Sequence, residues 1–370
     1  MATRVVHLRT LAELDGIADV WQAFARANDD GSLFQSWIWN RAWCESFVRG
    51  QPGTQLDVRV IEDGAGRIEA ILPFCRGRPA GPLFRVVEFL GRRMSQHNDV
   101  LLASPGSFEL ADEVVDALRR GLGPTTILHL RHLASDSTFT QRLLAKGLAE
   151  PLCPRLHLEA DHGLKDQSDR LGRSSRKTFR LATNRMTREF GIGFQVRSGD
   201  AFPGAFDALI ALHQRRFASA GRSTLLEGRA LAFLKGVTSR LSMEGQFEIV
   251  QLEAAGRTVA AALMAHDRRC YRLINSGFDP DLAYFSPMRI LLAETMRRAF
   301  HDLGCVRYDL GPGYQRYKYE WNPIVGMNYY GCLGGYGAYA KVGAALYRRA
   351  FLMRSPRVPS NKITSAPEAP

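Results

Sequence analysis

This sequence has no long apolar segment: none of its apolar runs reaches the ~18 residues that indicate a membrane-spanning helix. Its start, MATRVVHLRT, also lacks the apolar core of a secretion signal and predicts a β-strand instead. We therefore expect a cytoplasmic protein, for which a peripheral contact with the inner membrane stays open.

Motifs for metals, disulfides and covalent catalysis are missing as well. The six cysteines include no CxxC pair, and neither they nor the nine histidines show metal-ligand spacing. The cysteines are Cys44, Cys75, Cys153, Cys270, Cys305 and Cys332. Most have apolar neighbours, so we expect buried, reduced thiols. No GxSxG motif marks a serine nucleophile.

Acidic residues are outnumbered by basic ones, 37 Asp and Glu against 49 Lys and Arg, which gives a net charge of +12. This excess favours an anionic partner: a nucleotide, a phosphosugar, a membrane surface or a nucleic acid. Nucleic acid is disfavoured, because aromatic residues are not interleaved with the basic ones and no nucleic-acid-binding motif occurs.

The two halves of the chain repeat one order of elements. The first predicts a strand at VVHLRT, helices over 11–27 and 37–48, strands DVRVIED, RIEAILPFC and RVVEFLG, a helix over 108–121 and the strand TTILHLRHL. The second predicts helices FDALIALHQRRFAS and GRALAFLKGVTSRL, strands FEIVQLEA, TVAAALMAHD and CYRLINSG, a helix over 286–303 and the strand CVRYDLG. The assignments rest on hydrophobic periodicity and on hairpin turns.

The two hairpins also share residues, since GRIEA at 66–70 matches GRTVA at 256–260. A duplicated unit is therefore expected, with the fold class α/β (α+β): two tandem units, each a mixed, mostly antiparallel sheet flanked by helices. We expect an N-terminal unit over 1–160 and a C-terminal unit over 161–335. Residues 336–370 should form a helix followed by a disordered, Pro- and Ser-rich tail.

Two basic helical segments lie outside the repeated order. Near the start of the second unit, Arg173, Lys177 and Arg180 share one side of a helix, which predicts a solvated face or a site for an anionic substrate or lipid. The segment YGAYAKVGAALYRRAFLMR is predicted to pack on the second unit. Its alternative position is a lipid surface, with Lys341, Arg348, Arg349 and Arg354 near headgroups.

In the second half, the segment GFDPDLAYFSPMR is the first candidate for a binding site. Ser286 is a good N-cap and Pro287 suits the first helical position. The free N–H groups of that turn, with Arg289, predict a site for an anion such as a pyrophosphate. An ordinary capped helix is the alternative.

A second cluster, YDLGPGYQRYKYEW, follows a predicted strand directly. Loops at this position line ligand crevices in open α/β sheets. Asp309 could accept a proton there, and Lys318 could neutralise a phosphate or an oxyanion. The alternative makes Asp309 a capping acid and the tyrosines packing residues.

The first half offers two weaker candidates. The polar run SQHND, residues 95–99, lies between apolar strands and predicts either a cleft or a hydrogen-bonded turn. The run FQSWIW starts a helix, with Ser36 as its cap and aromatic side chains expected in the core.

These segments together resemble the CelD/BcsL-type acetyltransferase family, a GNAT branch often met near polysaccharide biosynthesis genes and distantly similar to the Fem peptidyltransferases. The resemblance covers residues 33–321 and rests on FQSWIW, EFLGRRMSQHNDVLL, RSSRKTFR, GFDPDLAYFSP and YDLGPGYQRYKYEW, in that order. It implies two tandem GNAT-like units. It also implies an acyltransferase, typically an N-acetyltransferase, acting on a sugar or another precursor of polysaccharide or cell envelope.

The resemblance further implies that the second unit binds acyl-CoA, acetyl-CoA in the typical case, as co-substrate without a metal. The residues assigned to it are Phe285, Ser286, Pro287, Met288 and Arg289. Catalytic roles fall to Asp99, Asp309, Tyr317 and Lys318, and substrate contacts to Gln35, Trp39, His97, Arg176 and Trp321. The chain departs from the family where Met288 replaces a usual glycine and where Tyr314 and Gln315 replace acidic residues.

GNAT chemistry is direct transfer: the protein aligns an unprotonated amine with the thioester and polarises its carbonyl, with no covalent enzyme intermediate. Two other functions stay open. One is a Fem-type transferase that takes its acyl group from aminoacyl-tRNA. The other is a non-catalytic GNAT-like scaffold at a membrane synthase complex. The sequence leaves the acceptor, the acyl chain, the carrier (CoA or acyl carrier protein) and the oligomeric state undetermined.

Overall fold

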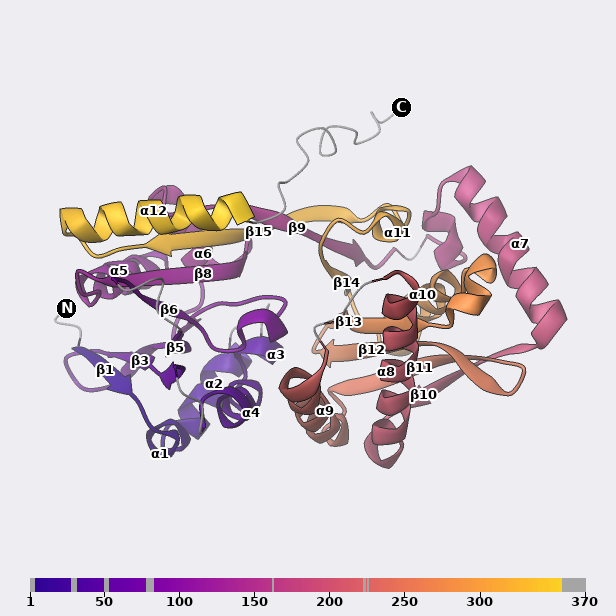
Figure 1. The fold of residues 1–370 in the computed structure, drawn as a ribbon, viewed down its shortest axis with the longest axis horizontal. Helices are drawn as coiled ribbons and strands as arrows, with labels where there is room; N and C mark the ends of the chain where they lie inside the picture. Colours follow the sequence, from indigo (N-terminus) through magenta and orange to yellow (C-terminus); the bar gives the residue numbers. More distant parts are fainter. Residues whose placement is uncertain are drawn as a thin grey trace. The chain divides into compact units, whose positions relative to one another are not determined.

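The computed structural model describes residues 4–27, 32–49, 53–77, 83–161, 163–221, 224 and 226–354. The chain forms two compact units, drawn in Figure 1. Unit 1 comprises residues 1–153 and 327–370, and unit 2 comprises residues 154–326. Unit 1 is therefore discontinuous, and the chain leaves it through strand β9 (Ala149–Glu159) and returns through β15 (Ile324–Leu333).

This division differs from the boundaries expected at 160/161 and 335/336. The reason is that β15 pairs antiparallel with β8 (Thr126–Ala134), and helix α12 (Ala338–Arg354) also packs on β8. In Figure 1 the yellow C-terminal helix accordingly lies along the purple strands of unit 1. The expectation that this helix packs on the second unit was wrong. The tail expected to be disordered, residues 355–370, lies outside the described residues.

Unit 1 contains two sheet segments. One has the order β1-β3-β4-β7 and is antiparallel; the other has the order β15-β8-β6-β5-β2, in which β6 and β8 are parallel. The strands are β1 (Arg4–Leu8), β2 (Gln55–Leu56), β3 (Val58–Glu62), β4 (Ile68–Leu72), β5 (Phe74–Arg76), β6 (Arg85–Phe89) and β7 (Leu101–Leu102). The helices before α12 are α1 (Leu11–Asp15), α2 (Ala18–Ala27), α3 (Ser32–Gln35), α4 (Trp37–Phe47), α5 (Phe108–Arg120) and α6 (Thr138–Ala145). The core lies between α5, α6 and the strands, around Val114, Leu128 and Phe139.

Unit 2 contains the sheet segment β10-β11-β12-β13-β14-β9, in which only β13 and β14 are parallel neighbours among the described strands. Its strands are β10 (Ile192–Arg197), β11 (Phe247–Ala254), β12 (Arg257–Asp267), β13 (Cys270–Phe278) and β14 (Arg307–Pro312). Its helices are α7 (Arg173–Phe190), α8 (Phe202–Ser219), α9 (Gly228–Met243), α10 (Pro287–Arg297) and α11 (Arg316–Tyr319).

Helices cover both faces of the unit 2 sheet. The even-numbered residues Ala260, Ala262 and Met264 of β12 share one hydrophobic core with Leu291 of α10. Helix α8 also packs on β12 and β13. Because successive strand residues point to opposite faces, this pattern is a sheet buried on both sides. The predicted fold class is confirmed: each unit is a mixed, mostly antiparallel sheet flanked by helices.

Within the described ranges, no helix combines the length and hydropathy that crossing a membrane requires. All six cysteines are free thiols; four are buried, and Cys153 and Cys332 are half-buried.

A close approach of helix α8 to strand β13 gives a test of this packing. A Cβ built on Gly277 of β13 would collide with the backbone of His213 in α8. We expect Gly277→Ala to destabilise the protein by about 1–3 kcal/mol, since two backbones would have to separate. The unfolding midpoint in urea measures this. Gly236→Ala in α9 is the control: no atom lies within 4 Å of its Cβ, and the helix should gain about 0.5–1 kcal/mol. Equal midpoints for the two variants would contradict the packing.

Candidate functional site

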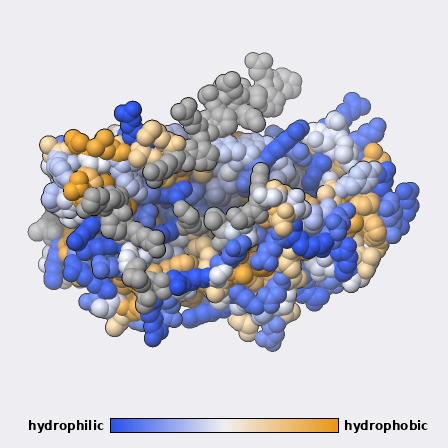
Figure 2. Space-filling model, in the orientation of Figure 1, coloured by the Kyte–Doolittle hydropathy of each residue, from blue (hydrophilic) through white to orange (hydrophobic). Residues whose placement is uncertain are grey.

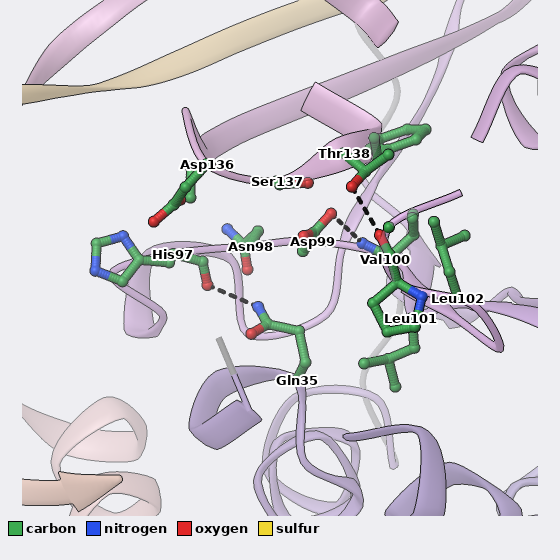
Figure 3. Close-up of a pocket in the computed structure, with 14 residues that line it drawn as sticks. Gln35, His97, Asn98, Asp99, Val100, Leu101, Leu102, Asp136, Ser137 and Thr138 are labelled. Atoms are coloured by element: carbon green, nitrogen blue, oxygen red, sulfur yellow. Dashed lines mark hydrogen bonds between the residues drawn. The ribbon is translucent and has the colours of Figure 1, made fainter. Parts of the chain in front are cut away.

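Unit 1 holds a pocket of about 240 Å³ beside the segment that joins β6 to β7 (Figure 3). Its lining comes from the end of α3, from this segment and from the start of α6. The lining residues are Gln35, His97, Asn98, Asp99, Val100, Leu101, Leu102, Pro105, Gly106, Ala134, Asp136, Ser137, Thr138 and Phe139. Three of the residues assigned from the sequence, Gln35, His97 and Asp99, are thus brought together.

Buried hydrogen bonds fix the wall of this pocket. The Gln35 side-chain amide donates to the carbonyl of His97 at 3.0 Å, and the Trp39 indole donates to Ser95 Oγ at 3.0 Å. The backbone N–H of Asn98 donates to the carbonyl of His132 at 2.9 Å. Gln35 is 2% exposed, and its Oε1 has no partner among the described residues. The pocket wall therefore contains a buried oxygen atom, Gln35 Oε1, that can accept a hydrogen bond from a ligand.

Asp99 is the titratable group best placed for proton transfer. Its carboxylate accepts from the N–H of Val100 at 2.8 Å and from the hydroxyl of Ser137. Burial raises the pKa of Asp99 to about 7, opposed by these two hydrogen bonds and assisted by the negative charge of Asp136. A carboxyl group that titrates near neutral pH suits a general base.

The start of α6 adds the pocket's remaining polar groups. Ser137 caps this helix by accepting from the N–H of Thr140 at 3.3 Å, and Thr138 donates to the carbonyl of Pro105 at 2.7 Å. In Figure 3 the carboxylate of Asp136 lies on the same side as the His97 ring. Two carboxyl groups and an amide oxygen make this a site for an amine or ammonium group.

Sequence reasoning did not find Asp136 and Ser137. A signal was present, because Ser137 precedes a helical run as an N-cap residue does. Trp39, assigned to substrate, is fully buried and meets Phe34 edge-to-face at 5.1 Å. It is a core aromatic side chain, as expected, and it contacts the segment that lines the pocket through its hydrogen bond to Ser95.

In unit 2, Asp309 lies at the centre of a buried ion cluster. It is fully buried, and its Oδ2 lies 2.8 Å from Arg272 Nη1 and 3.3 Å from Arg155 Nε. Its Oδ1 accepts from the N–H of Gly311 at 2.7 Å. A carboxylate that is fully buried and bonded to two guanidinium groups and a backbone N–H is closed off from a substrate, so the contacts fit a structural role better than the assigned proton acceptor.

Lys318 and its neighbours shape the loop after β14. The Lys318 ammonium donates to the carbonyls of Pro312 at 3.0 Å and Gly311 at 3.4 Å, so the buried lysine ties the loop to itself. Burial raises the pKa of the half-buried Tyr317, which keeps its phenol protonated. Trp321 is fully buried, and its indole N–H finds no acceptor among the described residues.

The turn before α10 differs in part from the expectation. Pro287 occupies the first helical position as predicted, but Ser286 is left-handed (φ 54°) and its side chain makes no capping hydrogen bond. The carbonyl of Ser286 instead accepts from the N–H groups of Arg289 at 2.9 Å and Ile290 at 3.3 Å. The expected row of free N–H groups is therefore reduced to that of Met288.

The side chains of this turn are mostly buried. Met288 is 8% exposed and packs in the core, so its side chain points away from the turn and does not crowd it. Phe285 packs edge-to-face on Phe190 at 5.3 Å. Ser286 is partly exposed, whereas the Arg289 side chain is only 16% exposed. Arg289 Nε lies 3.4 Å from Glu320, and its Nη2 donates to the carbonyl of Ser175 at 3.4 Å. The turn can thus offer one amide and one partly compensated guanidinium to an anion.

Arg176, assigned to substrate, holds the start of α7. Its guanidinium lies 3.1 Å from the Asp169 carboxylate and donates to the carbonyls of Asp169 and Leu171. Arg173, Lys177 and Arg180 on the same helix are exposed, which leaves a basic face as the sequence predicted.

A family model matches the part of the chain that forms most of unit 2. Residues 173–319, which include β13, α10 and β14, match the family model described as an acetyltransferase (GNAT) domain. The GNAT resemblance is confirmed for this stretch, whereas the narrower CelD/BcsL assignment stays a prediction. No curated protein matches the sequence.

Solved structures share the fold over most of the chain. A crystal structure of FemX is 12% identical, covers 94% of this chain and 99% of its own, and has a TM-score of 0.61. The C-terminal domain of a putative lysylphosphatidylglycerol synthetase from Agrobacterium fabrum is 14% identical, with coverage of 95% and 99% and a TM-score of 0.56. The L-PGS structure from Bacillus licheniformis is 11% identical, with 91% and 97% coverage and a TM-score of 0.51. At these identities the similarity concerns the fold alone.

The ion cluster predicts the effect of a charge deletion. Asp309→Asn removes the buried negative charge that Arg272 and Arg155 share, and it should destabilise the protein by about 3–5 kcal/mol, measured by urea unfolding. Asp302→Asn is the matched control, because Asp302 pairs with Arg297 at 2.8 Å on the surface and should cost less than about 1 kcal/mol. An unfolding midpoint unchanged by Asp309→Asn would contradict the structural role.

Proposed function

We propose that the protein is a GNAT-type acyltransferase that moves an acyl group from a CoA thioester, acetyl-CoA in the first instance, to an amine. The observation that carries this proposal is the match of residues 173–319 to the GNAT acetyltransferase domain. The donor binds unit 2 at the turn before α10, where the Met288 N–H and the Arg289 side chain bind a phosphate of the CoA diphosphate.

The acceptor amine binds the unit 1 pocket. Asp99 takes a proton from the ammonium group, and Asp136 and Gln35 Oε1 accept hydrogen bonds from its remaining N–H groups. The freed nitrogen lone pair attacks the acyl carbon and the carbon–sulfur bond breaks. The departing thiolate takes up the second proton, which the nitrogen loses as it becomes a neutral amide. Asp99 is preferred over Asp309 as base because its pKa lies near 7 and no cation among the described residues pairs with it.

Two assigned residues support the donor side in this proposal. Tyr317, kept protonated by burial, donates a hydrogen bond to the oxyanion or the departing thiolate. Lys318 positions the loop through the carbonyls of Gly311 and Pro312.

For the acceptor we propose an amine on a sugar or on another cell-envelope precursor. The resemblance to the CelD/BcsL-type family supports a glycan precursor. An anionic precursor would agree with the +12 net charge, while its amine end would match the acidic pocket.

A second candidate is a transferase of the Fem type, with aminoacyl-tRNA as donor. The exposed basic face of α7, formed by Arg173, Lys177 and Arg180, favours it, because a polyanion can bind such a face. The shared fold with FemX is compatible with it. Both candidates use the same acceptor pocket and differ only in the activated acyl donor.

Donor binding separates the two candidates. Acetyl-CoA at a hundred times its Kd should stabilise the protein by about 2.7 kcal/mol, seen as a rise in Tm. Arg289→Ala should weaken this response about tenfold in ligand concentration, since one charged hydrogen bond to phosphate is lost. Arg297→Ala, at the other end of α10, is the control and should respond like wild type. A shift with aminoacyl-tRNA and none with any acyl-CoA would favour the Fem-type reaction, and no shift with either would favour the scaffold.

Asp99 predicts a pH dependence. Because its folded pKa is about 7 and only the ionised form accepts a proton, kcat/KM should rise with pH up to about pH 7 and then level off. Asp99→Asn should lower kcat by about 10²–10⁴-fold and remove this dependence. Glu109→Gln, an exposed acid on α5, is the control and should keep both.

The same group makes a prediction about stability that needs no substrate. Its folded pKa lies above the ordinary value of 3.8 for an aspartate, so the folded state binds more protons than the unfolded state between about pH 4 and pH 7. Stability from this group therefore falls as pH rises through that window. Asp99→Asn should raise Tm relative to wild type at pH 8 and have little effect at pH 4. A Tm lowered at pH 8 would contradict the raised pKa.

A further inference from the structure

Helix α12 presents one face to unit 1 along its length. Ala340 is 2% exposed, and Gly343 has no room for a Cβ because the Phe84 ring lies against it. Near the other end, Phe351 stacks on Tyr330 with ring centroids 4.5 Å apart. These contacts at both ends fix the rotation of the helix, and they therefore decide which side chains face away from the unit.

The opposite face of α12 is apolar and exposed. Large side chains recur on it at helical spacing: Tyr339 is 52% exposed, Val342 58%, Leu346 62% and Met353 69%. Figure 2 shows apolar residues, in orange and tan, gathered at the upper left, where Figure 1 places this helix. Beside it, Leu83 is also exposed, and its neighbour Phe84 stacks on Tyr339. Contiguous exposed apolar surface of this kind marks an interaction site.

The charges on this face have a single sign. The segment 338–354 contains no Asp or Glu. Lys341 and Arg348 stand seven residues apart on one border of the apolar face, and Arg349 stands within it. Arg348 is paired with Glu150, whereas Lys341 and Arg349 form no ion pair with a described residue. The nearest acid at the start of the helix, Asp116, already accepts from the Tyr336 hydroxyl at 3.0 Å.

An exposed apolar face that carries only positive charges favours some partners over others. A second copy docked symmetrically would bring two faces of the same positive charge together, which is unfavourable. The interface of an anionic membrane can bind both kinds of side chain on this face. Its acyl chains can bury Val342, Leu346 and Met353, and its phosphates can pair with the basic side chains. Long basic side chains beside apolar ones can reach the phosphates while their stems stay buried.

We infer that the outward face of α12 is a docking surface for an anionic phospholipid membrane, on which the helix lies parallel to the surface. The inference is independent of the proposed acyltransferase reaction, because it concerns neither the pocket nor the turn before α10. It would hold the protein at the surface of an anionic membrane.

Co-sedimentation with vesicles tests it, using the full-length protein without substrates. The protein should pellet with vesicles of phosphatidylcholine mixed with phosphatidylglycerol, bind phosphatidylcholine alone much more weakly, and release partly at high salt. Leu346→Glu and Arg349→Glu should each lower the partition coefficient by about tenfold or more, because one removes inserted apolar area and the other reverses a charge. Both positions are exposed, so Tm should stay within about a degree of wild type.

Leu181→Glu on α7 is the matched control. Leu181 is 60% exposed on a basic helix of unit 2, against 62% for Leu346, so it tests whether any exposed leucine beside basic residues suffices. Membrane binding should be unchanged in this variant. The inference is overturned if the wild type does not pellet with anionic vesicles, or if Leu181→Glu weakens binding as much as Leu346→Glu. A dimer in sedimentation velocity that Leu346→Glu dissolves, without vesicle binding, would instead assign this face to a second copy.

Discussion

One buried carboxylate, that of Asp309, holds the interior of unit 2 together. It lies on β14 and pairs with Arg272 of β13 and Arg155 of β9, so three neighbouring strands meet at a single negative charge. A buried charge tolerates neither a missing partner nor a shifted register, because the cost of desolvation is then uncompensated. The parallel pairing of β13 and β14 ends at Arg272 and Asp309, and the segment that carries α10 joins these two strands. The position of the proposed donor site therefore depends on this cluster.

Asp99 shows how environment separates two identical side chains. Asp309 is surrounded by guanidinium groups, whereas Asp99 has a hydroxyl, a backbone N–H and a second carboxyl group as neighbours. Hydrogen bonds alone do not offset the loss of solvation, so the pKa of Asp99 rises to about 7. The chemistry proposed for the pocket depends on this environment, in which the described residues place no cation against Asp99.

Local sequence signals predicted the helices and strands well, but they did not predict which strands far apart in the sequence pair with each other. The hairpin turns at Gly66 and Gly256 have positive φ, 78° and 72°, which the glycines signalled. The partners of Asp309 are set by the register of strands far apart in sequence, and no local pattern encodes that. The same holds for β15, whose partner β8 lies some two hundred residues earlier. Ser286 is the N-cap residue as predicted, but its side chain makes no capping hydrogen bond. The reason is that the preceding 3₁₀ turn ends at Ser286 in the left-handed conformation.

The discontinuity of unit 1 has a consequence during synthesis. Residues 154–326 form unit 2 without a break, so its strands are synthesised before helix α12. Most of strand β15 and all of helix α12 leave the ribosome after unit 2, and until they emerge β8 lacks β15 on one edge and the ring of Phe351 beside His129. The order of assembly is then reversed relative to the order of translation: the inserted unit can complete its core first, and the unit that began earlier waits for β15 and α12.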